Sequence, residues 1–245
     1  MPNRGDKSRE YLNSDNAPTT PAIIPVISAR GLTRVFGSGS ASIVAVNHVS
    51  LDVMPGETLA FMGRSGSGKT TLLNLLSGLD QPTSGEALFQ GNDLASFNES
   101  GLVELRRHKI SFIFQSFGLM PLLSAQENVE LPLHLSGLGW RDRRRRAQEA
   151  LDLVGLLSRA QHRPYELSGG EQQRASIARA LVTSPEVMFA DEPTGELDTT
   201  TASTIAAILK DISAKHGTTV LIATHDPVLA SIADRTLELV DGALT

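Results

Sequence analysis

The sequence predicts an α/β protein whose mainly parallel sheet is interrupted by a helical insert. Short apolar segments alternate with helix-like segments over most of the chain, which is typical of parallel sheets. A glycine-rich segment, GRSGSGKT, lies between an apolar strand-like segment and a helix-like one. The segment from about 116 to 183 differs, because it contains helix-compatible patterns and no convincing strand.

The composition restricts the classes to which the chain can belong. Its 245 residues, 40% of them hydrophobic, are enough to bury a sizeable core. The sequence has no cysteine, which excludes disulfides and thiolate metal sites. It has no signal peptide and no apolar run of about 18 residues, so we expect a cytosolic chain or one that reaches a membrane only through a partner. The formal net charge of −5 gives no overall attraction for nucleic acid, and we expect no such partner.

The expected elements follow an N-terminal tail. Residues 1–25 are rich in polar residues, proline and charge, so we expect a disordered tail followed by one domain over 26–245. Apolar patterns predict strands at 26–36, 43–54, 58–62, 110–115, 187–190, 219–223 and 236–240. Helical spacing predicts helices at 70–79, 141–157, 199–214 and 227–232. A helical subdomain is therefore expected at about 116–183.

The glycine-rich segment matches G-x-x-x-x-G-K-[ST] in the strand–loop–helix setting that this motif requires. Glycines let the backbone wrap a phosphate so that several N–H groups point inward, beside the positive end of the following helix. Lys69 adds a charge between the β- and γ-phosphates, and Thr70 offers a hydroxyl to Mg²⁺. The candidate nucleotide-binding residues are Gly63, Arg64, Ser65, Gly66, Ser67, Gly68, Lys69, Thr70 and Thr71. Alone, the motif leaves GTPases, small-molecule kinases, helicases and transporters open.

A second candidate group follows the predicted strand at 187–190. This apolar strand ends in Asp191 and Glu192, and the end of a parallel strand would place their charge beside the phosphate loop. Asp191 is expected to hold a water on Mg²⁺, and Glu192 to polarise the attacking water as a general base. An acidic pair before Pro193 also occurs as an ordinary helix N-cap followed by a turn, so this pair indicates a catalytic site only together with the other motifs.

The segment LSGGEQQR at 167–174 makes the prediction specific. Ser168, Gly169 and Gly170 precede a predicted helix, whose N-terminal N–H groups and macrodipole form a second anion site with the serine hydroxyl. In isolation the same residues describe an ordinary helix start. Together with GRSGSGKT and the acidic strand end, they resemble the signature of the nucleotide-binding subunits of ATP-binding-cassette (ABC) transporters. The resemblance covers about residues 27–244.

The resemblance implies a P-loop NTPase core of the ABC type, with an N-terminal antiparallel β subdomain and a helical insert that carries the signature. It implies that Gln115, at the end of ISFIFQ, touches Mg²⁺ and senses the transporter. It also implies that Asp198 lies at a dimer seam and that His225 contacts the γ-phosphate. The implied cofactors are ATP and Mg²⁺, with Glu192, His225, Lys69 and Gln115 as catalytic residues and Thr70, Gln115 and Asp191 (through water) around the metal.

Two positions depart from the family pattern. Phe36 stands where the family commonly stacks a tyrosine on adenine, and because stacking needs only the ring, we expect nucleotide binding to survive in somewhat weakened form. Such stacking contributes about 1–3 kcal/mol per base in nucleic-acid complexes. Glu196 replaces the more usual asparagine, a change to which the sequence assigns no effect.

The resemblance also implies partners. In the family the signature meets the γ-phosphate held by the other subunit, so two copies are expected to form a head-to-tail dimer around two ATP molecules. FQSFGLMP at 114–121 and QENVE at 126–130 resemble the lipoprotein-releasing, macrolide-export and cell-division group. This implies an ATP-hydrolysing subunit that energises an integral membrane permease from the cytoplasmic face of the inner or plasma membrane. The transported substrate is a property of the permease.

Other functions fit less well. A soluble ABC ATPase that acts on DNA or ribosomes usually carries two cassettes or a long coiled-coil insertion, and this sequence contains neither. An inactive regulatory module would have lost catalytic residues, which this sequence retains. An enzyme that transfers phosphate to a small molecule would not need the signature. The arginine run at 141–146 is interpreted as a solvated helix face, with contact to anionic lipids as the alternative.

Overall fold

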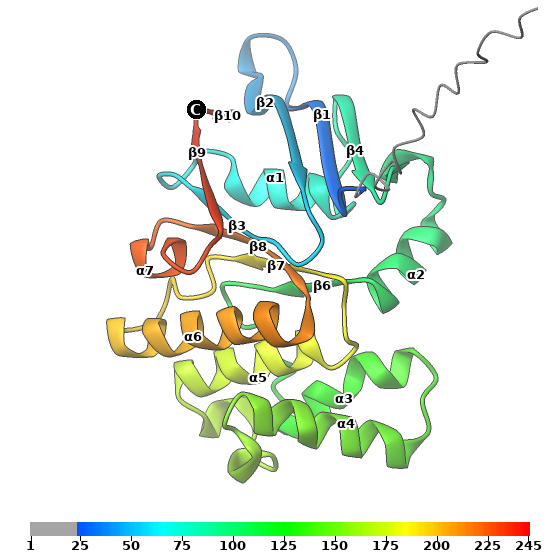
Figure 1. Ribbon diagram of the computed structural model, residues 1–245, viewed down its shortest axis with the longest axis vertical. Helices are drawn as coiled ribbons and strands as arrows, with labels where there is room; N and C mark the ends of the chain where they lie inside the picture. The colour runs from blue at the N-terminus through cyan, green and yellow to red at the C-terminus, as the bar shows by residue number, and fades with distance from the viewer. Residues whose placement is uncertain (1–23) are drawn as a thin grey trace, which may run out of the picture.

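The computed structural model describes residues 24–245, which form two sheets with helices between and below them (Figure 1). The expected tail at 1–25 lies outside the described residues except for its last two positions. The first sheet is antiparallel, with the order β2 (Ile43–Val53), β1 (Ile27–Phe36), β4 (Ser84–Phe89) and β5 (Asn92–Asp93). This confirms the antiparallel N-terminal β subdomain.

The second sheet confirms the mainly parallel core. Its neighbouring strands are parallel except at β10, which pairs with β9 in the antiparallel sense. The strand order is β10 (Ala243–Leu244), β9 (Arg235–Val240), β3 (Thr58–Met62), β8 (Thr219–Thr224), β7 (Val187–Asp191) and β6 (Ile110–Ile113).

The helices form layers around this sheet. Figure 1 shows α1 between the two sheets, and α6, α5, α3 and α4 below the parallel sheet. The helices are α1 (Lys69–Leu76), α2 (Glu99–His108), α3 (Ala125–Leu135), α4 (Trp140–Leu153), α5 (Gly169–Leu181), α6 (Thr199–His216) and α7 (Pro227–Ala230). Short 3₁₀ turns occur at Gly39–Ala41, Leu94–Ser96, Leu157–Arg159 and Pro164–Glu166.

Strand β7 contributes to two hydrophobic cores because alternate side chains point to opposite faces of a sheet. Phe189 packs in the core that holds the leucines of α1, whereas Met188 and Ala190 pack in the core with α5 and α6. All three side chains are completely buried. A strand covered on both faces is required in a parallel sheet between helices, and full burial of one such phenylalanine stabilises the fold by about 1.5–3 kcal/mol.

Several predicted boundaries are wrong. The strand expected at 110–115 ends at Ile113, where its pairing with Ala190 of β7 stops, so Gln115 lies in the following turn. The helix expected at 141–157 ends at Leu153, because Gly155 adopts a left-handed conformation with φ +64°. Strands β4, β5 and β10 and helix α2 are absent from the prediction.

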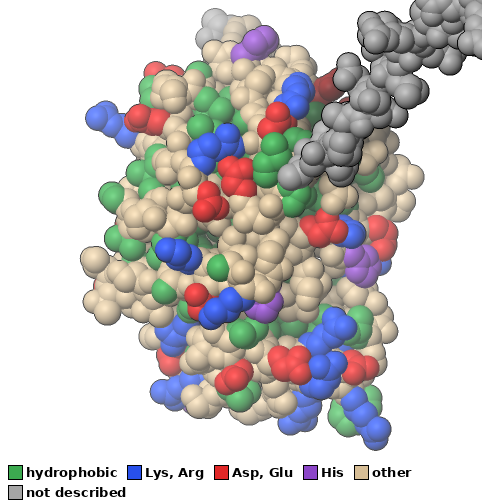
Figure 2. All heavy atoms as spheres, in the orientation of Figure 1, with side chains coloured by type: hydrophobic (Ala, Val, Ile, Leu, Met, Phe, Trp, Pro, Cys, Tyr) green, Lys and Arg blue, Asp and Glu red, His purple; other side chains and the backbone are tan. Residues whose placement is uncertain are grey.

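The arginine run lies on the exposed side of α4. Arg145 is bonded to Glu149 at 2.8 Å and lies 3.7 Å from Asp142, so acidic neighbours on the same helix partly neutralise the run. The face in Figure 2 shows basic and acidic side chains intermixed over the helical end of the molecule. No helix within residues 24–245 is both long enough and apolar enough to cross a bilayer.

Candidate functional site

The phosphate loop joins the end of β3 to the start of α1, as predicted. Gly66 and Gly68 have φ values of +83° and +101°, which residues with a side chain rarely adopt. A Cβ at Gly68 would lie 2.0 Å from the carbonyl oxygen of Ala45 on β2, so only glycine fits there. The loop is therefore fixed between α1 and the antiparallel sheet.

Lys69 lies almost completely inside this loop, with 6% of its side chain exposed. Its Nζ donates to the carbonyl oxygens of Gly63 at 2.7 Å and Arg64 at 3.1 Å, and it lies 3.3 Å from Oε1 of Glu192. The buried hydroxyl of Ser67 in the same loop has no hydrogen-bond partner. A buried ammonium and an unpaired hydroxyl in one loop fit a phosphate group, whose oxygens would give Ser67 the partner it lacks and replace the present partners of Lys69.

Thr70 and Asp191 meet although 121 positions separate them. The Thr70 hydroxyl donates to Oδ1 of Asp191 at 3.1 Å, which joins the start of α1 to the end of β7. Burial raises the pKa of Asp191, and the charge of Glu192 adds to the increase, while the Thr70 bond and Lys69 oppose it. A hydroxyl beside one carboxylate fits Mg²⁺, which takes few protein ligands and completes its shell with phosphates and waters.

Glu192 follows the last residue of β7 in a strained backbone conformation, with φ +44°. Its N–H donates to Ala223 of β8 at 2.8 Å, which holds the turn against the sheet. Its Oε2 is 2.9 Å from Nδ1 of His225, and its Oε1 is the atom that faces Lys69. The carboxylate is thus held between the Lys69 ammonium and the His225 imidazole and is only 15% exposed.

Gln115 reaches the same region from the turn after β6. A Cβ added to Gly195 would lie 3.2 Å from Nε2 of Gln115, and the Gly195 N–H donates to the carbonyl of Glu192 at 3.0 Å. The predicted residues Lys69, Gln115, Glu192 and His225 therefore surround one place, at the carboxyl ends of the parallel strands.

The signature residues form the start of α5. Ser168 is the N-cap, and its Oγ accepts from the N–H of Glu171 at 3.3 Å and donates to the Glu171 carboxylate at 3.0 Å. The N–H of Ser168 holds the pKa of Glu171 below its usual value. A Cβ at Gly170 would lie 2.4 Å from Cγ2 of Thr201, so this glycine allows α5 to approach α6 closely.

The structure does not bring the signature to the phosphate loop of the same chain. The leucines of α1 belong to the core on one face of the parallel sheet, and the apolar residues of α5 belong to the core on the other. In the described part of the chain, no hydrogen bond or ion pair joins residues 168–170 to residues 63–70. The two anion sites of one chain are separate.

Two other expected positions have local roles in the single chain. Asp198 is the N-cap of α6, where it accepts from the N–H groups of Thr200 and Thr201, and these bonds with the Thr201 hydroxyl lower its pKa. Phe36 ends β1 with 42% of its side chain exposed, so its ring is available for a base. Their contacts with a second subunit and with adenine remain predictions.

The sequence analysis missed a role for Gln173 in the middle of the signature. Its Nε2 donates to the carbonyl oxygen of Pro193 at 2.7 Å, and the side chain is completely buried. The signature helix is thereby bonded to the residue directly after Glu192. The only sequence signal was the place of Gln173 in LSGGEQQR, which says nothing about its partner.

The phosphate loop lies between a strand and a helix, and its lysine and threonine lie beside carboxylates at the end of β7, which is two strands away from β3 in the sheet. This arrangement defines a nucleotide-binding domain of the P-loop NTPase class. Within this class, a signature helix on the face of the sheet opposite to α1 indicates the ABC type. The chain belongs to the ABC transporter family: the family model described as ABC transporter matches residues 46–195.

Similar proteins agree with this assignment. The lipoprotein-releasing system ATP-binding protein LolD of Chromohalobacter salexigens is 44% identical over 90% of this chain and 93% of its own length. The macrolide export ATP-binding/permease protein MacB of Marinobacter nauticus is 43% identical over 90% of this chain, but the match spans only 34% of that relative. The ATP-binding cassette MJ0796, solved as a dimer in a post-hydrolysis state with ADP and Pi, matches with a TM-score of 0.83 at 40% identity, covering 89% of this chain and 96% of that one.

Replacement of Asp191 by asparagine is predicted to stabilise the nucleotide-free protein at neutral pH. Because folding raises the pKa of Asp191, the folded state binds more protons than the unfolded state between the two pKa values, and stability falls as the pH rises through that window. Asp191→Asn removes the penalised charge. Thermal unfolding should give a higher Tm than wild type at pH 7, with a difference that closes as the pH approaches 3.8.

Asp198→Ala is the matched control of opposite sign, because the pKa of Asp198 is lowered on folding and its charge stabilises the start of α6. We expect this variant to unfold at a lower temperature than wild type at pH 7, with a smaller difference in acid. An Asp191→Asn protein that unfolds at or below the wild-type temperature at pH 7 would contradict the account of Asp191.

Proposed function

We propose that this chain binds and hydrolyses ATP with Mg²⁺ and energises an integral membrane permease as one of two copies in the complex. The observation that carries the proposal is the position of Glu192, which is held between Lys69 of the phosphate loop and His225 after β8. The LolD relative, which matches over nearly its whole length, is an ATP-binding protein of a lipoprotein-releasing system. Residues 26–245 constitute the ATPase domain in this proposal.

The residues divide the work of hydrolysis. The loop amides and Lys69 hold the phosphates, which replace the carbonyl and carboxylate partners that Lys69 has in the free chain. Thr70, Gln115 and Asp191, the last through water, would hold Mg²⁺, which would neutralise charge on the phosphates. Glu192, freed from Lys69, accepts a proton from the water as the water oxygen bonds to the γ-phosphorus and the bond to ADP breaks. His225 holds the Glu192 carboxylate in place at Oε2.

A second copy supplies the signature. The start of α5 presents helix N–H groups, the Ser168 cap and a positive helix end, which fit the γ-phosphate of another chain. Two chains in head-to-tail arrangement then complete two sites related by a twofold axis. The dimeric state of the MJ0796 cassette with ADP and Pi supports this arrangement.

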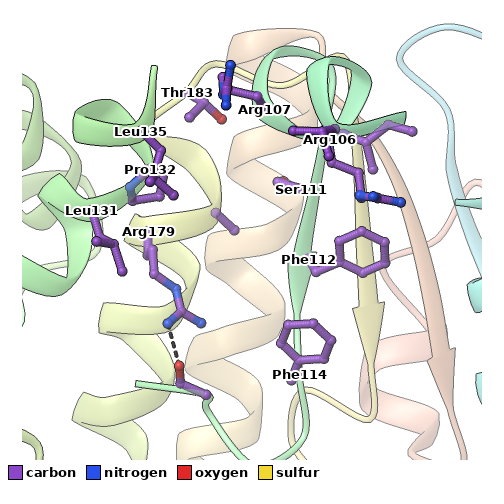
Figure 3. A pocket seen from close by; sticks show the side chains of 14 residues that line it. Arg106, Arg107, Ser111, Phe112, Phe114, Leu131, Pro132, Leu135, Arg179 and Thr183 are labelled. Atoms are coloured by element: carbon purple, nitrogen blue, oxygen red, sulfur yellow. Dashed lines mark hydrogen bonds between the residues drawn. The ribbon is translucent and has the colours of Figure 1, made fainter. Parts of the chain in front are cut away.

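An apolar groove beside Gln115 is the surface that we assign to the permease. Figure 3 shows Phe112 of β6, Phe114 just after that strand, and Leu131 and Leu135 of α3 around it. Phe114 directly precedes Gln115, so a partner in the groove contacts the turn that carries a catalytic residue. The proposed location is the cytoplasmic face of the inner or plasma membrane, where the chain binds peripherally through the permease. Exposed apolar side chains gathered in one hollow commonly mark an interaction site.

The first test replaces Glu192 by glutamine. We expect steady-state ATP hydrolysis to fall by about two to four orders of magnitude, the usual contribution of a general base, while ATP binding persists. Phosphate release is the measurement. Glu186→Gln is the control, because this residue precedes β7 at the opposite end of the strand and pairs with Lys109. Turnover that is undiminished in Glu192→Gln would remove Glu192 from the role of base.

The second test places a charge in the groove. Leu135 lines it with 62% of its side chain exposed, so Leu135→Glu should fold normally and keep its basal ATP hydrolysis. Purification from detergent-solubilised membranes of the source cells should recover an integral membrane protein with wild type and much less of it with Leu135→Glu. Leu157→Glu, an exposed leucine outside the groove, is the control. Equal recovery with Leu135→Glu and wild type would contradict the assignment of the groove.

A further inference from the structure

The end of β1 that carries Phe36 lies close to the phosphate loop. Phe36 pairs with Ile43 of β2, two residues before Ala45, whose carbonyl oxygen approaches Gly68. Farther along β2, the N–H of Asn47 donates to Gly242 at 2.8 Å, and Gly242 in turn donates to the carbonyl of Ser67. The antiparallel sheet is thus bonded to the loop on this side, which fixes the backbone of Phe36 relative to the phosphate loop.

One face of the Phe36 ring is covered by a cation. The guanidinium carbon of Arg34, two residues earlier on β1, lies 4.6 Å from the ring centroid. This is within the range of a cation–π contact, in which the positive charge attracts the π electrons of the ring. The ring remains 42% exposed, so the contact leaves surface of Phe36 free for a second stacking partner.

Arg34 is held in this position by the turn that follows α1. Its Nη2 bonds to Oδ1 of Asp80 at 2.9 Å, and the same oxygen accepts the N–H of Gln81 at 2.8 Å. The turn itself is bonded to β1 on both sides of Arg34. The N–H of Thr83 donates to Thr33, and the Thr83 hydroxyl accepts the N–H of Val35. The guanidinium therefore has a fixed anchor.

We propose that Arg34 is a positioning residue for the adenine base and acts through Phe36. The inference rests on the proposed function, because it concerns the base of the ATP that the phosphate loop holds. Arg34 polarises the ring towards itself and keeps it from rotating, so the opposite face is presented to the base in one orientation. Phe36 has no hydroxyl that could fix the ring by a hydrogen bond, and the cation supplies this constraint instead.

The test measures the affinity of the wild-type protein and its variants for two ligands by calorimetric titration in the presence of Mg²⁺. One ligand is ATP, and the other is inorganic tripolyphosphate, which has no base. Arg34→Ala should weaken ATP binding about fivefold, the effect of one cation–π contact, and leave tripolyphosphate binding unchanged. Arg34→Lys keeps a charge that can pair with Asp80 but loses the flat guanidinium, so we expect a loss between wild type and Arg34→Ala.

A double-mutant cycle shows whether Arg34 acts through the ring. In a Phe36→Leu background, Arg34→Ala should cause no further loss of ATP affinity. Arg30→Ala is the matched control, because Arg30 lies on the same strand in an ion pair with Asp52 at 2.7 Å and contacts no aromatic face within residues 24–245. Its ATP affinity should equal that of wild type.

Three results would overturn the inference: a loss of tripolyphosphate binding equal to that of ATP, a full effect of Arg34→Ala without Phe36, or no effect of Arg34→Ala on ATP. If Arg34→Ala has no effect but the wild-type protein hydrolyses ATP, the proposed function still holds and only the role of Arg34 is rejected. A wild-type protein that binds neither ATP nor tripolyphosphate would overturn the proposed function itself.

Discussion

The separation of the two anion sites by the parallel sheet is the constraint on which the rest of the structure depends. Strand β7 is buried on both faces, so α1 must pack on one side of it and α5 on the other. The phosphate loop begins α1, and the signature begins α5. A single chain therefore carries its phosphate loop and its signature in opposite layers.

The same strand brings the chemistry to the phosphate loop. Its apolar residues are stable in the interior, and its end delivers Asp191 to Thr70 and Glu192 to Lys69. In the free chain these groups satisfy one another, which keeps a buried ammonium and two carboxylates paired without a ligand. In the proposed function, a phosphate group that enters the loop competes with Glu192 for Lys69, so occupation of the loop and release of the proposed base are linked.

Local patterns predicted much of this arrangement. Strands such as Thr58–Met62 and the phosphate loop were predicted in place, because continuous apolar runs and the Gly-Lys-Thr segment are local signals. Strand β4 was missed since only Ala87 and Phe89 are buried, and α2 since Leu105 is its only buried residue. Contacts between distant positions, such as Gln173 with Pro193, depend on the folded structure and have no local signal. The strand expected to carry Gln115 ends two residues before it, but the Gln115 side chain still lies beside Gly195, in the turn after Glu192.

The most direct measurement of the central claim mixes two inactive variants. Lys69→Ala removes the charge of the phosphate loop, and Gly169→Asp adds a negative charge at the start of α5, where a Cβ makes only ordinary contacts with Leu197 and Phe117. If each site combines the loop of one chain with the signature of another, the mixture contains one intact site per mixed dimer. ATP hydrolysis should then appear in the mixture and in neither variant alone. A mixture as inactive as its components would contradict the account.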